Sequence, residues 1–448
     1  MIRKHAAVAY WLARDAHATA CALDLERDAL RALAMRRMRA LLVDAQRAPF
    51  HALRMRAAGL TRPGALRDME LPHAMQSLAP VSKSELREAG DEALRDGRAS
   101  ASWFSSRSSG SAGEPFRVFY DARAWSMLKY LVKARSRRAG GLKWTDRVAI
   151  LDAIPQADEL RSPLERAGRL RRISVFRTPA AIAEMLATYE PAAIYALPSA
   201  LLEIARAMES GAPRVRTSRI FTSGELLTGS ARQAIVAAFG GDLRDVYGTS
   251  ETKEIAWECE AGSRHVNSDV VHVEILDEQD APVPAGTEGE IVVTLLVSRA
   301  MPLVRYRTGD RGSLLSVTCS CGRAAPLLGV VSGREADTIH LPDGTTRSPY
   351  LLTMALERVA GLAQYQIVQA ERDLLRVSAV AEAGVDHSTV PSAIVDALRY
   401  ELPRDVRIDV AVVDRIERGA REKVRVVCPL PLSREPAAAL VGAPGALP

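Results

Sequence analysis

The sequence has few cysteines, few aromatic residues and no long apolar run, and each shortage excludes a class of protein. Five cysteines spread over 448 residues do not make the disulfide framework of a small secreted domain. No apolar run approaches the ~20 residues that a membrane-spanning helix needs. Apolar residues still make up 48% and charged residues 25% of the chain, which is typical of a globular protein and excludes disorder and fibres.

Lysine is also rare, since only seven of the 60 basic residues are lysines. With a net charge of +6, this arginine-rich balance is compositional and lacks the one-sided clustering of a nucleic-acid footprint. Residues 1–20 are basic and apolar in the manner of a secretion signal, but Arg14 and Asp15 interrupt the apolar stretch. We therefore expect a cytoplasmic protein without nucleic-acid or membrane partners.

The length predicts two or three structural units. Residues 1–95 have a helical, basic pattern, in which Leu30, Ala34, Met38 and Leu41 form one apolar stripe. Residues 96–333 alternate short apolar strands with helices, which favours a mostly parallel sheet covered by helices. The predicted strands are 147–151, 193–197, 219–223 and 243–247, and the predicted helices are 178–189, 199–208 and 230–239.

Helices are absent from the pattern between about 265 and 318, where strands 271–276, 290–296 and 302–306 predict a β subdomain. The pattern of residues 334–430 predicts a small α/β domain. It has a helix at about 349–359, strands at 365–369 and 374–380, and a second helix that ends near residue 400. The Ala/Pro/Gly-rich tail 431–448 is predicted to be disordered. The fold class is thus α/β: a large domain with a doubly wound sheet and a β subdomain, followed by a small domain.

The densest local signal is the Ser/Gly-rich stretch 105–115, SSRSSGSAGEP. Small hydroxyl residues and glycines let backbone N–H groups and Ser Oγ atoms crowd around an anion. The stretch is no Walker A loop, because no Gly-Lys-Ser/Thr follows. Alone, such a stretch is more often a flexible loop, and the motifs downstream change that interpretation.

Four further motifs follow in order: TSGE at 222–225, YGTSE at 247–251, RYRTGD at 305–310 and GREAD at 333–337. With the Ser/Gly loop they resemble the adenylate-forming superfamily, and most closely its phenylacetate–CoA ligase branch with its capsule-biosynthesis relatives. PVSK at 80–83, LPS at 197–199 and QYQIVQ at 364–369 are similar to landmarks of that branch. The resemblance therefore covers nearly the whole chain, and it implies that the small domain is mobile.

The resemblance implies a role for each motif. The loop would wrap the ATP phosphates with Ser108, Ser109, Gly110, Ser111 and Gly113. Glu251 would hold Mg²⁺ against the phosphates, within a turn that includes Gly248, Thr249 and Ser250. Tyr247 would stack on adenine, Glu225 would flank the nucleotide, Asp310 would accept hydrogen bonds from the ribose hydroxyls, and Arg334 would contact ribose or phosphate.

Lys423 is the only lysine after Lys253, in a region where arginine fills the other basic positions. A lone lysine indicates a need for a compact, mobile point charge. Relatives carry a C-terminal lysine that neutralises the carboxylate–phosphoryl transition state, so the resemblance implies a catalytic role for Lys423 beside Ser109 and Glu251. The alternative is an ordinary surface lysine.

Cys259 and His265 are six positions apart, and Cys319 and Cys321 form a C-x-C pair. Three thiolates and an imidazole are the ligands of a closed tetrahedral Zn²⁺ site, so a structural zinc ion is predicted. The alternative is free cysteines beside a surface histidine.

The sequence thus predicts a ligase that couples ATP and a carboxylic acid into acyl-AMP and pyrophosphate and then forms a thioester. Coenzyme A is the expected acceptor, with an acyl carrier protein or an amine as the alternative, and the expected acid is aryl or apolar. Because Ala112 and Ala336 depart from the family pattern, a non-catalytic nucleotide-binding scaffold is the second alternative. Some members of the branch are dimers, so a homodimer is one expected state.

Overall fold

A computed structural model describes residues 2–61, 71–107, 116–152, 167–175, 177–329, 333–334, 339–343, 346–347, 352, 355–356, 359–382, 384–399, 402–416, 427–428 and 430. The predicted tail 431–448 lies outside these residues, as do most of the predicted helix at 349–359 and the GREAD motif beyond Arg334. None of the described helices is both long and apolar enough to cross a membrane.

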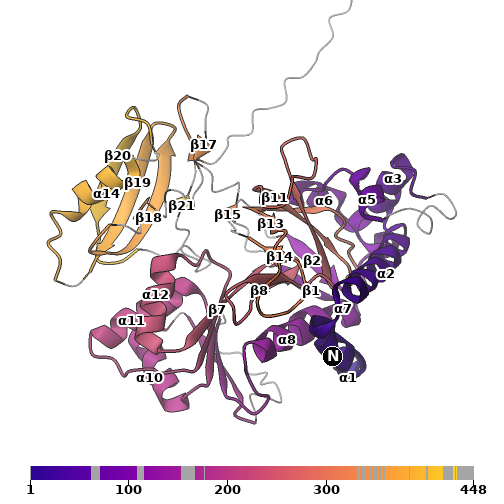
Figure 1. Ribbon diagram of the computed structural model, residues 1–448, viewed down its shortest axis with the longest axis horizontal. Helices are drawn as coiled ribbons and strands as arrows, with labels where there is room; N and C mark the ends of the chain where they lie inside the picture. Colours follow the sequence, from indigo (N-terminus) through magenta and orange to yellow (C-terminus); the bar gives the residue numbers. More distant parts are fainter. Residues whose placement is uncertain are drawn as a thin grey trace, which may run out of the picture.

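The described part of residues 2–97 is built of helices, in agreement with the helical pattern of the sequence (Figure 1). The apolar stripe on α2 is buried, because its spacings of four, four and three keep Leu30, Ala34, Met38 and Leu41 on one face. A capping box of Ser82 and Glu85 begins α6. The elements are α1 (Ile2–Cys21), η1 (Ala22–Asp24), α2 (Arg27–Ala45), α3 (Pro49–Ala57), α5 (Leu71–Gln76), α6 (Lys83–Ala89), η2 (Gly90–Ala93) and η3 (Arg95–Gly97).

A short antiparallel hairpin and a broken helix connect this region to the main sheet. The hairpin pairs β1 (Phe104–Arg107) with β2 (Arg117–Tyr120), and Arg107 is the direct partner of Arg117. The helix begins as α7 (Ala122–Ser126), passes through a π-helical turn at Met127–Leu131, labelled η4, and continues as α8 (Val132–Ala139). The π-helical turn is of interest because such turns occur frequently at functional sites.

The main sheet has the strand order β13-β14-β9-β8-β7-β6-β5-β3-β4. Its half from β4 to β7 is parallel, as predicted, whereas the half from β7 to β13 is antiparallel and was not predicted. The strands are β3 (Val148–Asp152), β4 (Leu170–Ser174), β5 (Ala193–Ala196), β6 (Arg219–Ser223), β7 (Asp242–Thr249), β8 (Lys253–Glu258), β9 (Arg264–Val266), β13 (Leu314–Leu315) and β14 (Leu327–Leu328).

Helices cover both faces of the parallel half (Figure 1). Ile194 and Ile220 pack under α10 (Pro179–Tyr189), α11 (Pro198–Glu209) and α12 (Gly229–Phe239). Their neighbours Tyr195 and Phe221 belong to the core on the opposite face, which includes Ala139 of α8. This alternation follows from the two-residue period of a strand, and it confirms the doubly wound fold class.

The β subdomain is a four-stranded antiparallel sheet of β10 (Val271–Leu276), β11 (Gly289–Leu295), β12 (Tyr306–Gly312) and β15 (Gly333–Arg334). The first two strands agree with the prediction, but the strand predicted at 302–306 is wrong because β12 starts only at Tyr306. Arg305 has a φ of 52°, which no regular strand accommodates. Its buried guanidinium pairs with Glu274 at 3.1 Å and donates to the Leu78 carbonyl, so this side chain fixes the turn.

The small C-terminal unit has its own core, to which strands and a helix contribute. The order is β20-β19-β18-β21, with β18 (Leu362–Glu371), β19 (Leu374–Ala381), β20 (Arg407–Val412), β21 (Val427–Cys428) and α14 (Val390–Arg399). Two small strands, β16 (Ile339–His340) and β17 (Thr346–Arg347), pair beside it. The predicted strands at 365–369 and 374–380 are confirmed. Arg206 of α11 donates to the Ala363 carbonyl at 2.8 Å, which joins the unit to the main domain.

Candidate active site

Motifs far apart in the sequence meet at the carboxyl edge of the parallel strands. In open α/β sheets this edge is where ligands bind. The Tyr247 hydroxyl of β7 donates to Asp310 Oδ2 of β12 at 2.8 Å, and Asp310 is only 7% exposed. Asp310 is also the direct strand partner of Arg334, although the Arg334 side chain is outside the described set. The structure thus brings together the backbone positions assigned to adenine, ribose and the domain junction.

The YGTSE motif forms the tight connection between β7 and β8. A Cβ atom on Gly248 would lie 2.1 Å from the Lys253 carbonyl oxygen, so only glycine fits there. Thr249 Oγ1 accepts hydrogen bonds from the backbone N–H groups of Glu251 and Thr252, at 3.3 and 3.1 Å, which fixes the turn.

The Glu251 carboxylate has a buried setting and a cationic partner. Its Oε1 lies 3.2 Å from Lys83 Nζ, and the side chain of Glu251 is 4% exposed. The Tyr120 hydroxyl donates to the Glu251 backbone carbonyl at 2.6 Å. Oxygen ligands of this kind suit Mg²⁺, and the buried Glu251 carboxylate beside Lys83 is a fitting donor for that ion.

The N-terminal segment reaches this turn because it is hydrogen-bonded to the β subdomain. The Val81 N–H donates to the Arg305 carbonyl at 2.7 Å, and the Arg307 N–H donates to the Val81 carbonyl at 2.9 Å. Val81 is therefore a short parallel bridge beside Tyr306. Lys83 follows two residues later, at the start of α6, and this is how it reaches Glu251.

Lys253 connects the same turn to the hairpin that precedes the Ser/Gly loop. Its Nζ donates to Ser106 Oγ and to the Ser250 carbonyl, both at 2.7 Å. Burial, together with the charges of Lys133 and Lys129, lowers the pKa of Lys253 to about 8. The predicted phosphate-binding residues Ser108, Ser109, Gly110, Ser111 and Gly113 lie outside the described residues, but the strands on both sides of them adjoin the Glu251 turn.

Two other predicted site residues have different outcomes. Glu225 accepts hydrogen bonds from the backbone N–H and the hydroxyl of Ser199, both at 3.0 Å, and so it caps the first turn of α11. Glu225 therefore has a structural role, and its predicted role of flanking the nucleotide stays a prediction. Lys423 lies outside the described residues, and its catalytic role stays a prediction.

The residues that the sequence did not single out are Lys83 and Lys253. Lys83 was noted only as part of a landmark motif, and Lys253 only as the lysine before Lys423. A usable signal was present, because a chain with seven lysines among 60 basic residues uses each lysine in place of an available arginine. The rarity that pointed to Lys423 also marked these two.

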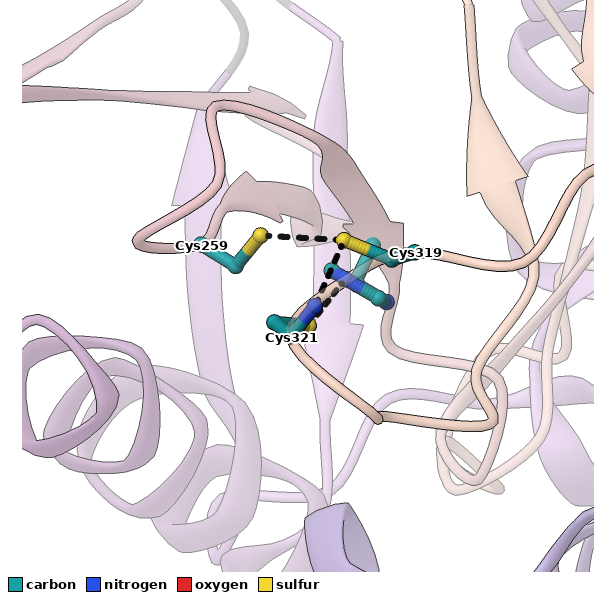
Figure 2. A group of neighbouring side chains, drawn as sticks. Cys259, Cys319 and Cys321 are labelled. Carbon is teal, nitrogen blue, oxygen red and sulfur yellow. Dashed lines mark hydrogen bonds between the residues drawn. The ribbon is translucent and has the colours of Figure 1, made fainter.

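The four predicted zinc ligands come together at the antiparallel end of the main sheet, and Figure 2 shows the three cysteines of the group. The possible ligand atoms of Cys259, His265, Cys319 and Cys321 all lie within 4.8 Å of one another. Cys259 Sγ is 3.5 Å from Cys319 Sγ, and Cys321 Sγ is 3.2 Å from His265 Nε2. Zn–S bonds of about 2.3 Å and Zn–N bonds of about 2.1 Å fit a cluster of this size.

Two glycine turns shape the cluster. Gly262 and Gly322 have φ angles of 72° and 81°, and their N–H groups bond back to the carbonyls of Cys259 and Cys319. The second ring nitrogen of the histidine, Nδ1, lies 3.2 Å from the Ala325 carbonyl. That contact suits a tautomer whose Nε2 is left to bind a metal. A metal here would link the end of β8 and the strand β9 to the loop between β13 and β14.

A shallow hollow lies on the opposite edge of the sheet, at the amino ends of β3, β5 and β6. Its lining includes Arg147, Glu190 and Arg216. Its lining includes none of the predicted site residues that the structure describes, and ligands of such sheets bind at the carboxyl edge. We therefore assign the chemistry to the edge that carries Tyr247, Glu251 and Asp310.

Comparisons with known proteins agree with this architecture. Phenylacetate-coenzyme A ligase of Aromatoleum evansii is 28% identical over 396 residues, which cover 79% of this chain and 85% of that protein. A 2-hydroxyisobutyryl-CoA ligase in its postadenylation state, in complex with R3-HIB-AMP, has a TM-score of 0.74 at 21% identity and covers 91% of both chains. The same enzyme with 2-HIB-AMP and CoA in the thioesterification state has a TM-score of 0.61 at 20% identity over 92% of both chains. No protein-family model matches the chain.

These comparisons confirm the resemblance to the adenylate-forming superfamily and to its phenylacetate–CoA ligase branch. They also confirm the α/β fold class and the prediction that the chain is a ligase.

Proposed function

We propose that the protein couples a carboxylic acid to coenzyme A in two steps, with an aryl or apolar acid as substrate. In the first step an acid carboxylate oxygen attacks the α-phosphorus of ATP, and pyrophosphate leaves. In the second step the thiol sulfur attacks the acyl carbon, the thiol proton is lost, and AMP leaves. The acid–thiol ligases among the similar proteins support this order of events.

The observation that carries the proposal is the convergence of Tyr247 and Asp310. The two residues are 63 positions apart, yet their side chains are joined by a 2.8 Å hydrogen bond at the ligand-binding edge of the sheet. The phenol, held by the carboxylate, offers an aromatic face for adenine. Asp310 offers an acceptor-only carboxylate, the type of group that suits ribose hydroxyls.

The remaining roles follow from position. Ser108, Ser109, Gly110, Ser111 and Gly113 would bind the β- and γ-phosphates from the hairpin whose first strand ends next to Lys253. Glu251 would hold Mg²⁺, which neutralises phosphate charge. Gly248, Thr249 and Ser250 keep the turn that presents this carboxylate, and Arg334 and Lys423 would supply positive charge from the small domain, Lys423 to the transition state.

We also propose that Cys259, His265, Cys319 and Cys321 hold a structural zinc ion. Four protein ligands leave no open position, so the ion would stabilise the fold without taking part in the reaction. The cluster geometry supports this proposal.

Coenzyme A is the acceptor that the similar ligases favour. An acyl carrier protein or an amine is the alternative acceptor, and a non-catalytic nucleotide-binding scaffold is the alternative to catalysis. No described contact favours either of them.

The test is acid-dependent pyrophosphate release and ATP–pyrophosphate exchange with a panel of aryl and aliphatic acids. Asp310→Asn should raise the KM for ATP at least tenfold, because an amide replaces the ribose-binding carboxylate. Lys423→Ala should abolish acid-dependent pyrophosphate release while ATP still raises the melting temperature. If ATP raises the melting temperature of the protein but no acid in the panel supports ATP–pyrophosphate exchange, the ligase function is excluded and the nucleotide-binding scaffold is favoured.

A further inference from the structure

Three of the seven lysines gather on the α8 face of the sheet. Lys129 belongs to the π-helical turn Met127–Leu131, Lys133 to the first turn of α8, and Lys253 to the start of β8. A π-helical turn redirects the side chains that follow it and occurs often at functional sites. We refer to Lys129, Lys133 and Lys253 as the lysine cluster.

Aromatic rings line the lysine cluster. Lys129 Nζ lies 4.4 Å from the ring centroid of Trp125, and Lys133 Nζ lies 5.3 Å from that of Tyr195. Lys253 Nζ lies 5.4 Å from the centroid of Tyr120. These distances are typical of cation–π contacts. The cluster therefore combines an aromatic surface with positive charge, which is what an aromatic anion needs for binding.

The charges around the lysine cluster do not balance. The carboxylates that influence Lys129 and Lys133 most are Asp152, at the end of β3, and the buried Glu254. Arg137 shares the Tyr195 ring at 5.2 Å, and Arg172 lies 4.0 Å from Asp152. Glu251 adds a third carboxylate near Lys253. Five cations thus stand against three carboxylates: Lys129, Lys133, Lys253, Arg137 and Arg172 against Asp152, Glu254 and Glu251.

The two helical lysines have no carboxylate within ion-pair distance among the described residues. Burial, with added repulsion from neighbouring cations, lowers the pKa values of Lys129 and Lys133. Ammonium groups crowded in this way are stabilised when an anion joins them. The cluster is therefore arranged to receive negative charge from a ligand.

The position of the cluster separates it from the predicted nucleotide residues. Tyr195 lies on β5, which is two strands away from the Tyr247-bearing strand β7. At about 4.8 Å per strand the separation is roughly 10 Å. Ser106, the partner of Lys253, stands just before the predicted phosphate-binding loop. An acid bound beside a nucleotide at the proposed Tyr247–Asp310 position would extend across the sheet toward Tyr195 and the helical lysines.

We propose that Lys129 and Lys133 bind a second anionic group on the acid, so that the substrate class is an aromatic acid carrying a further carboxylate or an equivalent anion. This inference rests on the proposed ligase function and narrows its substrate. The aromatic walls hold the ring, the two ammonium groups pair with the distal anion, and the other carboxylate is left to attack ATP.

The test compares acids of matched shape. Pyrophosphate release is measured with terephthalate against 4-methylbenzoate, isophthalate against 3-methylbenzoate, and 4-carboxyphenylacetate against 4-methylphenylacetate. We expect the native enzyme to favour the charged member of at least one pair by tenfold or more in kcat/KM. Lys129→Met or Lys133→Met should reduce that ratio at least tenfold, and Lys133→Arg should retain most of it.

Lys143→Met is the matched control, because Lys143 is an exposed lysine on the loop before β3, and it should keep the native ratio. The melting temperature of each variant, with and without ATP, establishes whether the variant is folded. If a methionine variant does not fold, Lys129→Gln takes its place in the comparison. A native preference for the methyl acids would overturn the inference and leave the ligase function intact. An unchanged ratio with a raised KM for ATP would assign the lysines to the triphosphate and also overturn it. Failure with every acid would refute the ligase function itself.

Discussion

Replacing Lys83 with methionine tests whether the buried Glu251 carboxylate depends on this lysine. Two unit charges 3.2 Å apart attract by about 5 kcal/mol at an effective dielectric constant of about 20. Removing one partner of a fully buried pair costs about 3–5 kcal/mol, because the other charge is left unpaired. The Lys83 side chain is 28% exposed, so water screens part of this energy, and we expect a loss of about 2 kcal/mol in the free energy of unfolding.

Calorimetric melting measures this loss. A deficit of ~2 kcal/mol corresponds to a fall of roughly 4 °C in a domain of this size, whereas Lys143→Met should melt within 1 °C or so of the native protein because surface changes cost little. Methionine keeps most of the apolar stem of lysine, so the difference isolates the charge.

The same variant separates two uses of Glu251. If Glu251 holds Mg²⁺ as proposed, Lys83 competes with the ion for the carboxylate. Removing the ammonium group should then increase the stabilisation by Mg²⁺ with ATP relative to the native protein. If Lys83→Met melts like Lys143→Met, and Mg²⁺ with ATP shifts both equally, the ion pair has no energetic weight and the reasoning about Glu251 is refuted.

Two further predictions concern the rest of the chain. The native protein should contain about one zinc ion, and Cys319→Ser should lose that ion together with several degrees of melting temperature. The control variant Cys21→Ser, at an exposed cysteine outside the cluster, should keep the ion and the native melting temperature. Elemental analysis that finds no metal in the native protein would eliminate the site. Burial and the neighbouring Arg54 lower the pKa of His51 to about 3. Below pH 6.5 the His51 imidazole therefore takes up a proton in the unfolded chain but stays neutral in the folded chain. Stability should therefore fall by about 2 kcal/mol between pH 6.5 and pH 5 from this residue, and His51→Gln should flatten that part of the profile; an unchanged slope in denaturant titrations would contradict the assignment.

The sequence was most informative where a local pattern decides the structure. The parallel strands at 193–196 and 219–223 appeared within a residue or two of prediction because buried strands are short apolar runs. The helix α2 was found from the spacing of its apolar stripe. The residues of the zinc cluster were found from type and spacing alone, and the structure places all four together.

The sequence was least informative where a distant residue decides the structure. The prediction of a strand at 302–306 is wrong because the chain turns at Arg305, whose side chain contacts Glu274 and the Leu78 carbonyl. No local sequence pattern reveals these two contacts. Lys83 meets Glu251 across 168 positions, and its importance becomes visible only once the turn after β7 is built. The lysine cluster was missed for the same reason, since its members come from a helix and a strand more than 100 residues apart.

The distribution of charge along one sheet edge connects these findings. Carboxylates stand where the nucleotide is proposed to bind, with Asp310 beside β7 and Glu251 at the following turn, and they suit ribose hydroxyls and a magnesium ion. Lys129 and Lys133 stand where the distal anion of the acid is proposed to bind. An acid with two anionic groups brings additional negative charge toward a triphosphate, and fixed cations paired with the distal anion reduce that repulsion before the attack begins. Arginine is abundant in this chain. The use of lysine at these positions therefore indicates that a compact ammonium group, and not the planar guanidinium group of arginine, is needed to bind the anion.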